Sequence, residues 1–211
     1  QFYAIGVDMR DPYYVCGGLQ DNSSWCGPSE SASSYGIRNS DWYDVSGGDG
    51  FYTAQHPLEP HILFAESQGG NMARFNRLTG ERTSLVKPSW RPRYTQFEDS
   101  ILIERGDTVR TPSRDQERRL TDLRARQRTD SAEFDMRWNW NTPFFLSPHN
   151  PDVFYAAGNR VVKSTQRGDN LFPISPDLSK KQAAKIDTSM RRTGGITLDA
   201  TGAETYGTVV A

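Results

Sequence analysis

The chain has 211 residues, a formal net charge of -1 and 35% hydrophobic residues. A charge this close to zero gives no field that would draw the chain to nucleic acid or to an anionic membrane. No apolar run approaches the roughly 18 residues that a membrane span needs. With 18 glycines, 12 prolines and 11% aromatic residues, the composition favours many short strands joined by turns over long helices.

The first unit, about residues 1–46, predicts four short strands, at 3–7, 13–20, 23–27 and 42–46, with a serine-rich loop before the last. Cys16 and Cys26 fall on the second and third of these strands. If the two strands form a hairpin, the cysteines face each other across it. A disulfide is then expected and would imply an oxidising compartment, while two thiols packed under a loop are the alternative.

The second unit, about residues 47–88, predicts four more strands, at 50–54, 62–66, 71–76 and 83–87. The second unit shares a sequence motif with the first: an acid or Asn, then Pro, then an apolar strand that ends in small residues. This phrase is built on Pro12, Pro60 and Pro151. The first two copies are 48 positions apart, and the third is in phase if about 40 residues are inserted before it.

The insertion, about residues 89–135, predicts one helix near 113–130. Pro112 suits a first turn, and Ser113 and Gln116 have the spacing of a capping box. Few apolar residues follow, and arginines alternate with acids, so we expect a solvated peripheral helix that leans on the rim of the domain. Nucleic-acid binding is disfavoured because the acids cancel any basic patch.

The third unit, about residues 137–178, again predicts four strands, at 144–146, 153–157, 160–164 and 171–174. Residues 179–193 are expected to be a polar loop with room for one helical turn, and residues 205–211 to be one strand of a fourth unit. Four antiparallel strands in about 40 residues are typical of one β-propeller blade. The predicted fold is therefore all-β: a partial β-propeller over 1–211, with three four-stranded antiparallel blades, one strand of a fourth and a helical insertion.

Because the chain starts and stops inside apparent strands, we expect a piece of a longer protein. The remaining propeller blades of that protein are its predicted partners, and edges left open are expected to associate.

Residues 164–172 resemble the Asp-box, or BNR repeat, of sialidases and sortilin-type propellers, which reads Ser/Thr-x-Asp-x-Gly-x-Thr-Trp between the third and fourth strands of a blade. Ser164 and Gly168 match this pattern, whereas Gln166 replaces its Asp and Leu171 its Trp. Longer phrases at 17–25, 48–50, 66–71, 138–143 and 174–178 together resemble large bacterial exported proteins of the sortilin-type or BNR-repeat "glycosyl hydrolase-like" group. The resemblance implies a multi-bladed propeller that is secreted, periplasmic or on the cell surface, and implies no proven activity.

Propeller ligands bind at the mouth of the central channel, so polar residues near the transitions between blades are candidates for binding. These candidates are Gln20, Asn22, Gln68, Asn71, Asn139 and Asn141. Asp21 and Asp49 are weak catalytic candidates, as the paired carboxylates of glycoside hydrolysis. The competing interpretation is that both build tight turns by bonding the local backbone. Trp138 and Trp140 are expected to pack between blades rather than to stack on sugars.

Two function classes follow. The first is an exported binding or interaction module that recognises a peptide or a glycan at the channel mouth. The second is a glycoside hydrolase of a sialidase-like or xyloglucanase-like type, which leaves open whether the chain is an enzyme. His56, His61 and His149 lack the spacing of metal ligands, and no phosphate-cradling glycine loop precedes a helix, so no metal site and no cofactor is predicted.

Overall fold

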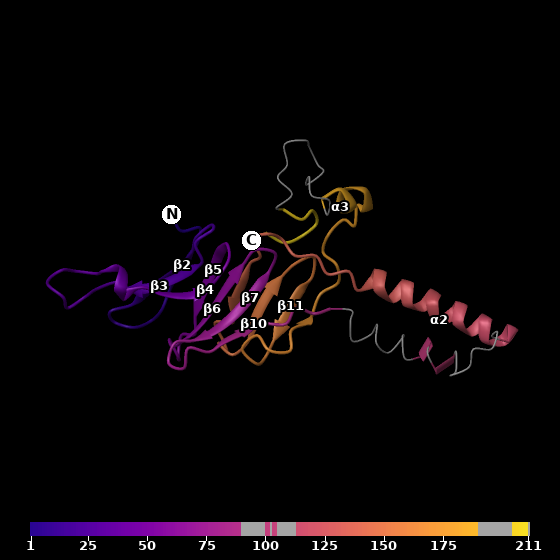
Figure 1. Cartoon of the computed structure of the whole chain (residues 1–211), viewed down its shortest axis with the longest axis horizontal. Helices are drawn as coiled ribbons and strands as arrows, with labels where there is room; N and C mark the ends of the chain where they lie inside the picture. The colour runs from indigo at the N-terminus through magenta and orange to yellow at the C-terminus, as the bar shows by residue number, and fades with distance from the viewer. Residues whose placement is uncertain (90–99, 102, 105–112, 190–203, 211) are drawn as a thin grey trace. The chain divides into compact units, whose positions relative to one another are not determined.

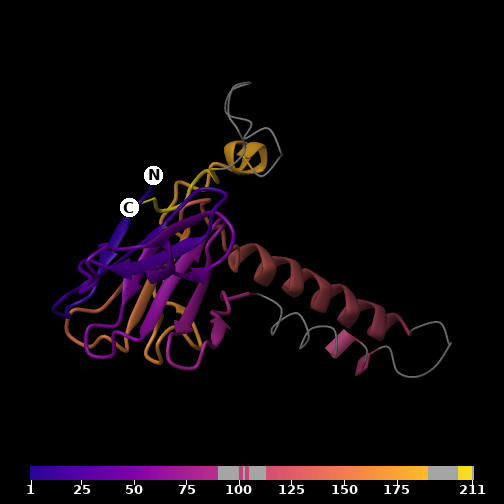
Figure 2. The same cartoon turned by 60° about the vertical axis from the view of Figure 1, so that its left-hand side comes forward.

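The computed structural model describes residues 1–89, 100, 101, 103, 104, 113–189 and 204–210. Two compact units are present, Gln1–Lys87 with Arg137–Ala211 as the first and Pro88–Met136 as the second. The first unit contains three four-stranded antiparallel sheets, which correspond to the three strand-rich units of the sequence (Figures 1 and 2).

Each sheet is a meander in which consecutive strands are hydrogen-bonded neighbours. Sheet 1 consists of β1 (Ile5–Val7), β2 (Tyr14–Gly18), β3 (Ser24–Pro28) and β4 (Tyr43–Ser46). Sheet 2 consists of β5 (Gly50–Gln55), β6 (Ile62–Ser67), β7 (Asn71–Asn76) and β8 (Arg82–Ser84). Sheet 3 consists of β9 (Phe144–Leu146), β10 (Phe154–Ala157), β11 (Val161–Ser164) and β12 (Phe172–Pro173). Every strand predicted for these sheets is therefore found, with ends that differ by no more than about three residues.

Sheet 2 lies between the other two, and all six residues of β6 are buried. Successive side chains of a strand point to opposite faces. Leu63 thus packs with Cys16 and Cys26 of sheet 1 in one core cluster, whereas the Phe64 ring lies 5.4 Å from that of Phe154 of sheet 3. Each sheet packs one face on the next sheet. The core therefore consists of two layers, one between sheets 1 and 2 and one between sheets 2 and 3.

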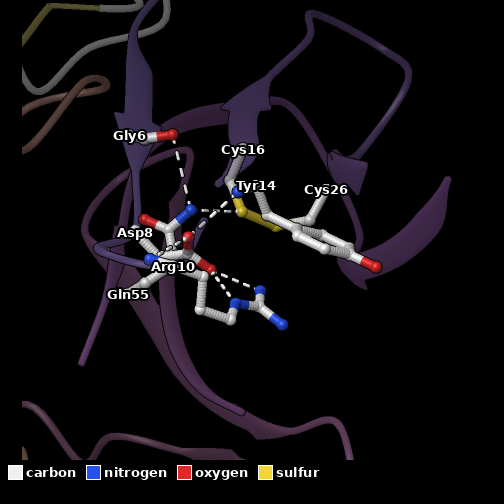
Figure 3. The surroundings of a disulfide bond; sticks show 7 residues. All are labelled: Gly6, Asp8, Arg10, Tyr14, Cys16, Cys26 and Gln55. Atoms are coloured by element: carbon white, nitrogen blue, oxygen red, sulfur yellow. Dashed lines mark hydrogen bonds and ion pairs between the residues drawn. A yellow bond between two sulfur atoms is a disulfide. The ribbon is translucent and has the colours of Figure 1, made fainter. Parts of the chain in front are cut away.

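The disulfide Cys16–Cys26 is confirmed and lies in the first of these layers (Figure 3). The two cysteines are directly opposite each other in the β2–β3 ladder, with Cα atoms 4.1 Å apart, and both are fully buried. Gln55, from β5 of sheet 2, donates through Nε2 to Cys16 Sγ (2.7 Å) and to the Gly6 carbonyl (3.4 Å). The bridge thus belongs to the interface between sheets 1 and 2, and its presence is consistent with an oxidising compartment.

Sheets 1 and 2 approach most closely at Gly18 and Gly50, where a Cβ on Gly18 would lie 2.0 Å from the Gly50 carbonyl carbon. Only glycine fits there, because any side chain would collide with backbone. Next to this contact, Gly48 has φ 85 and leads the chain from sheet 1 into β5. These glycines bring the connections of the two sheets together at one end of the domain.

The predicted helix is confirmed in the second unit as α2 (Arg114–Glu133), which runs three residues further than expected. Its capping box forms as predicted: Gln116 N donates to Ser113 Oγ (3.3 Å), and Ser113 N donates to Gln116 Oε1 (3.0 Å). Leu120 is buried, and most other described side chains of α2 are exposed. That the helix leans on the rim of the sheets stays a prediction.

Two expectations outside the sheets were wrong. Helix was expected at 113–130 and, outside the insertion, for at most one turn within 179–193. Instead a 3-10 turn, η1, also forms at Asn39–Asp41, and α3 (Ala183–Ser189) has seven residues. The Ala-Ala-Lys start of α3 has high helix propensity, which explains the difference. The strand of a fourth unit expected at 205–211 is not found in its described part, because residues 204–210 form turns and irregular backbone. The hydrogen bond from Val209 N to the Gly158 carbonyl (2.9 Å) does not make a ladder.

Candidate functional site

Polar residues from three alternate connections meet at one end of the sheets, and we call this group the rim. It comprises the β2–β3 hairpin, the β4–β5 connection and the β6–β7 hairpin. Asp21 N donates to Asp49 Oδ1 (2.7 Å), and Asp49 N donates to Gln68 Oε1 (2.8 Å). Candidates that the sequence placed far apart are thus joined into one hydrogen-bonded row.

The two carboxyl groups of the rim differ in their surroundings. Asp49 is buried, with 8% of its surface exposed, whereas Asp21 is exposed and has φ 58 in the hairpin turn. A hydrogen bond between the two side chains, together with charge repulsion, raises the pKa of Asp21 above its ordinary value. Retaining glycosidases hold their carboxyl groups about 5–5.5 Å apart and inverting ones further. One oxygen of the Asp49 carboxyl is also engaged by the Asp21 backbone N–H, which makes it less available to a substrate.

The β6–β7 hairpin is held by one of its own side chains, Asn71, and by Lys87, which follows β8. Asn71 Nδ2 donates to the Gln68 carbonyl (2.7 Å), and Lys87 Nζ donates to the Gly69 carbonyl (3.0 Å) and to Asn71 Oδ1 (3.2 Å). Gln68 and Asn71 therefore hold the turn, and Asn71 remains exposed beside Lys87. Their role in ligand binding stays a prediction.

The last two binding candidates lie where the chain enters sheet 3. Asn139 is 5% exposed, and its Oδ1 accepts from Thr205 N (3.0 Å) while its Nδ2 donates to the Asn141 carbonyl (3.4 Å). An amide buried in this way supports the backbone, which argues against direct contact with a ligand. Between the two asparagines, the Trp140 carbonyl accepts from Gly69 N (2.9 Å), which ties sheet 3 to the β6–β7 hairpin.

A cavity of about 510 Å³ opens beside the rim. Its lining side chains are uncharged, and Gln20 and Asn22 among them are predicted binding residues. The lining consists of Gln1, Phe2, Tyr3, Leu19, Gln20 and Asn22. The Tyr3 hydroxyl donates to Gln20 Oε1, and the Tyr3 ring packs on Phe51 at 4.9 Å. The Tyr3 side chain is thereby fixed at both ends, yet it remains 53% exposed.

Sequence reasoning missed Glu66, whose side chain is fully buried under the rim. Its Oε1 accepts from Gly70 N and from Thr142 N, both at 3.2 Å, and thereby joins sheet 2 to the entry of sheet 3. Within the described part of the chain, Oε2 has no hydrogen-bond partner. Burial raises the pKa of Glu66 to about 9, so the side chain is protonated at neutral pH. Its place in a β-strand among apolar residues was the available signal.

A second buried network, also missed from the sequence, lies at the end of sheet 3. Arg137 Nη2 donates to Asp177 Oδ2 (3.0 Å), to Ser179 Oγ (2.9 Å) and to the Gly207 carbonyl (3.4 Å). Burial opposes ionisation of Asp177, but the donors Ser179, Asn159 and Arg137 outweigh it and hold the pKa of Asp177 well below its usual range. This ion pair positions residues 177–179 and 207 on the β10–β11 hairpin.

The Asp-box-like segment forms a compact turn between β11 and β12, the position that the resemblance implies. Ser164 Oγ accepts from Gln166 N (3.0 Å) and Gly168 N (3.2 Å) and donates to the Asp169 carbonyl. Gln166, in place of the Asp of the repeat, accepts from Asn170 Nδ2 (2.8 Å) instead. The turn contacts sheet 2 through Arg74, which donates to the Arg167 carbonyl (2.7 Å). The segment is thus structural.

In the ranges that the structure describes, no group of three or more His, Cys, Asp or Glu side chains could hold a metal ion. His56 is buried, and its Nε2 lies 3.3 Å from Asp152 Oδ1. The described helices include none with the length and apolar character of a membrane span.

No protein-family model, curated protein or solved structure matches this chain.

Proposed function

We propose that this chain is part of an exported β-propeller that binds a neutral glycan at the rim. The cavity beside Tyr3 carries the proposal. An exposed aromatic face next to the amides of Gln20 and Asn22 is suited to a sugar, because the ring can pack on C–H groups while amides pair with hydroxyls.

The arrangement of the sheets supports the propeller. Two successive interfaces stack sheet on sheet in chain order. Gly50 N donates to the Leu19 carbonyl where β5 begins, and Val209 N donates to the Gly158 carbonyl at the corresponding place, both at 2.9 Å. The disulfide supports export, because such bonds persist in oxidising compartments.

Binding is favoured over hydrolysis by the contact between Asp21 and Asp49. A carboxyl that accepts a backbone N–H at 2.7 Å and hydrogen-bonds the other carboxyl is occupied on both sides. A retaining or inverting glycosidase instead needs its two carboxyl groups apart, on either side of the scissile bond.

The test is titration of the chain with neutral polysaccharides and their oligosaccharides by calorimetry. We expect Gln20→Ala and Asn22→Ala to weaken binding at least about tenfold, because each removes a polar group at the cavity. Asn39→Ala is the matched control, since Asn39 is exposed in the β3–β4 connection at the other end of the sheet.

Two results would contradict the proposal. Binding of peptides but of no glycan would reassign the cavity to a peptide. Release of new reducing ends, lost in Asp49→Asn with the fold intact, would establish a hydrolase.

A further inference from the structure

A second cavity, of about 350 Å³, is formed jointly by sheets 2 and 3, and we call it the sheet 2–3 cavity. It lies at the end of the sheets away from the rim, because strands alternate in direction and the β9–β10 and β11–β12 connections contribute to it. It shares no lining residue with the glycan cavity. Its charged lining residues are Arg74, Asp152, Arg167 and Asp169.

The two arginines of this cavity already have acceptors. Arg167 donates through Nε to Asp152 Oδ1 (2.6 Å) and through Nη1 and Nη2 to the carboxylate of Glu59, so all three of its nitrogens are engaged. Arg74 Nη1 donates to the Arg167 carbonyl (2.7 Å) and to Asp169 Oδ2 (3.1 Å). The positive charges are therefore paired within the protein.

The two carboxylates that line the cavity, in contrast, each keep one oxygen that is not hydrogen-bonded. In the part of the chain that the structure describes, no residue donates a hydrogen bond to Asp152 Oδ2 or to Asp169 Oδ1. These side chains are 44% and 45% exposed. Together with Glu59 they make three acids against two arginines. The cavity thus offers spare acceptors and a negative balance of charge.

Asp152 is held in position from below by His56, which is buried. His56 Nδ1 accepts from Glu59 N (3.1 Å), so Nδ1 carries no proton and the ring N–H at Nε2 points to Asp152 Oδ1 (3.3 Å). The hydrogen bond from Arg167 holds the pKa of Asp152 below its ordinary value. Asp152 therefore presents a charged and positioned carboxylate at neutral pH.

We propose that the sheet 2–3 cavity binds a primary ammonium group through the free oxygens of Asp152 and Asp169. An ammonium is a compact charge with three N–H donors, so it can bond single oxygens of separate carboxylates. A guanidinium pairs best with both oxygens of one carboxylate, and here each carboxylate has only one to offer. Among the described residues no group of three or more acids, histidines or cysteines could hold a metal ion, which disfavours a metal as the occupant.

Two sources carry this group, the lysine side chain of a peptide and an amino sugar. Titration of the isotope-labelled chain by NMR, with Nα-acetyl-lysine methylamide and separately with glucosamine, distinguishes them. We expect at least one probe to shift the backbone amide signals of Thr165 and Asp169 to saturation. The Nα,Nε-diacetyl form of the lysine probe has no charge and should leave these signals in place. Nα-acetyl-arginine methylamide should bind more weakly than the lysine probe.

Asp169→Asn removes one of the two free carboxylates at a half-exposed position and is expected to weaken binding of the ammonium probe at least about threefold. Asp152→Asn should weaken it as well. Asp122→Asn is the matched control, because Asp122 is an exposed carboxylate that pairs with Arg126 (2.8 Å) in the second unit. Thermal melting shows whether each variant is folded, and the comparison of charged with acetylated probe on the unmodified chain needs no variant.

Binding of the lysine probe alone would identify a peptide as the source, and binding of glucosamine alone an amino sugar; either supports the proposal. Four results would overturn it: no shift with either probe, equal binding of the diacetyl form, tighter binding of the arginine probe, or a folded Asp169→Asn variant that binds like the unmodified chain. Because the glycan titration depends on Gln20 and Asn22, the two proposals can fail separately.

Discussion

Replacing Glu66 by Gln tests whether a protonated carboxyl joins sheets 2 and 3. Glutamine keeps an Oε1 that can accept from Gly70 N and Thr142 N, and it places a neutral N–H₂ where the protonated carboxyl has its second oxygen. The change therefore preserves shape and both hydrogen bonds while it removes the ability to titrate.

The expected effect depends on pH. The pKa of Glu66 rises from 4.5, its ordinary value, to about 9 in the folded protein. Between these two values the folded chain keeps a proton that the unfolded chain has released. The contribution of Glu66 to stability is thus fully present below pH 4.5 and is lost as the pH rises toward 9. From pH 5 to pH 8 the loss is about 4 kcal/mol.

Urea unfolding at pH 5 and pH 8 measures this difference. We expect the stability of Glu66→Gln, relative to the unmodified chain, to increase by about 4 kcal/mol between the two pH values. Glu30→Gln, at an exposed loop position, is the control and should leave the pH dependence unchanged. A Glu66→Gln variant with the same pH dependence as the unmodified chain would show that Glu66 is ionised in the folded state and would refute the reasoning.

Two further predictions concern buried groups. Replacing both Cys16 and Cys26 by Ser is expected to lower the free energy of unfolding by about 2–5 kcal/mol, with a lower melting temperature in calorimetry; an unchanged melting temperature would show that the bridge adds nothing to sheet packing. Arg137→Met leaves the buried Asp177 without its cation and is expected to destabilise the first unit by about 3–5 kcal/mol. Asp177→Asn in the same background should recover part of this loss, and no recovery would mean that Arg137 acts through packing alone.

The strands could be predicted because local signals agreed with the repeat. Pro12, Pro60 and Pro151 each precede a central strand, and Gly158 with Asn159 marks the hairpin between β10 and β11. The capping box at Ser113 and Gln116 likewise depends on spacing alone. Such features need only near neighbours in the chain, so sequence reasoning reaches them.

The site could be predicted only in part, because its contacts cross between sheets. The sequence offered Asp21 and Asp49 as weak catalytic candidates or as turn residues, but it could not show that Asp49 Oδ1 accepts a hydrogen bond from Asp21 N. The apolar neighbours of Glu66 in its strand were a signal of burial, but the contact of its carboxyl with Thr142 follows only from the packing of sheet 3 on sheet 2. Asn139 was a candidate for ligand binding because of its polar amide. In the structure, however, its Oδ1 accepts a hydrogen bond from Thr205 N.

The distribution of polar groups explains why we propose a binding function near the rim rather than within the sheets. Both faces of sheet 2 are covered, and the polar groups in that interior, such as Gln55 on the disulfide and Glu66 on Gly70, hold one sheet to the next. A stacked-sheet domain of this kind has exposed polar side chains mainly where its hairpins emerge. In the cavity beside the rim, Tyr3, Gln20 and Asn22 combine exposure with fixed positions, because the Tyr3 hydroxyl donates to Gln20 Oε1 and Asn22 Nδ2 donates to the Gln20 carbonyl. Because these side chains are already held in place, little conformational entropy would be lost when a ligand binds. This is the physical reason to search for a ligand there.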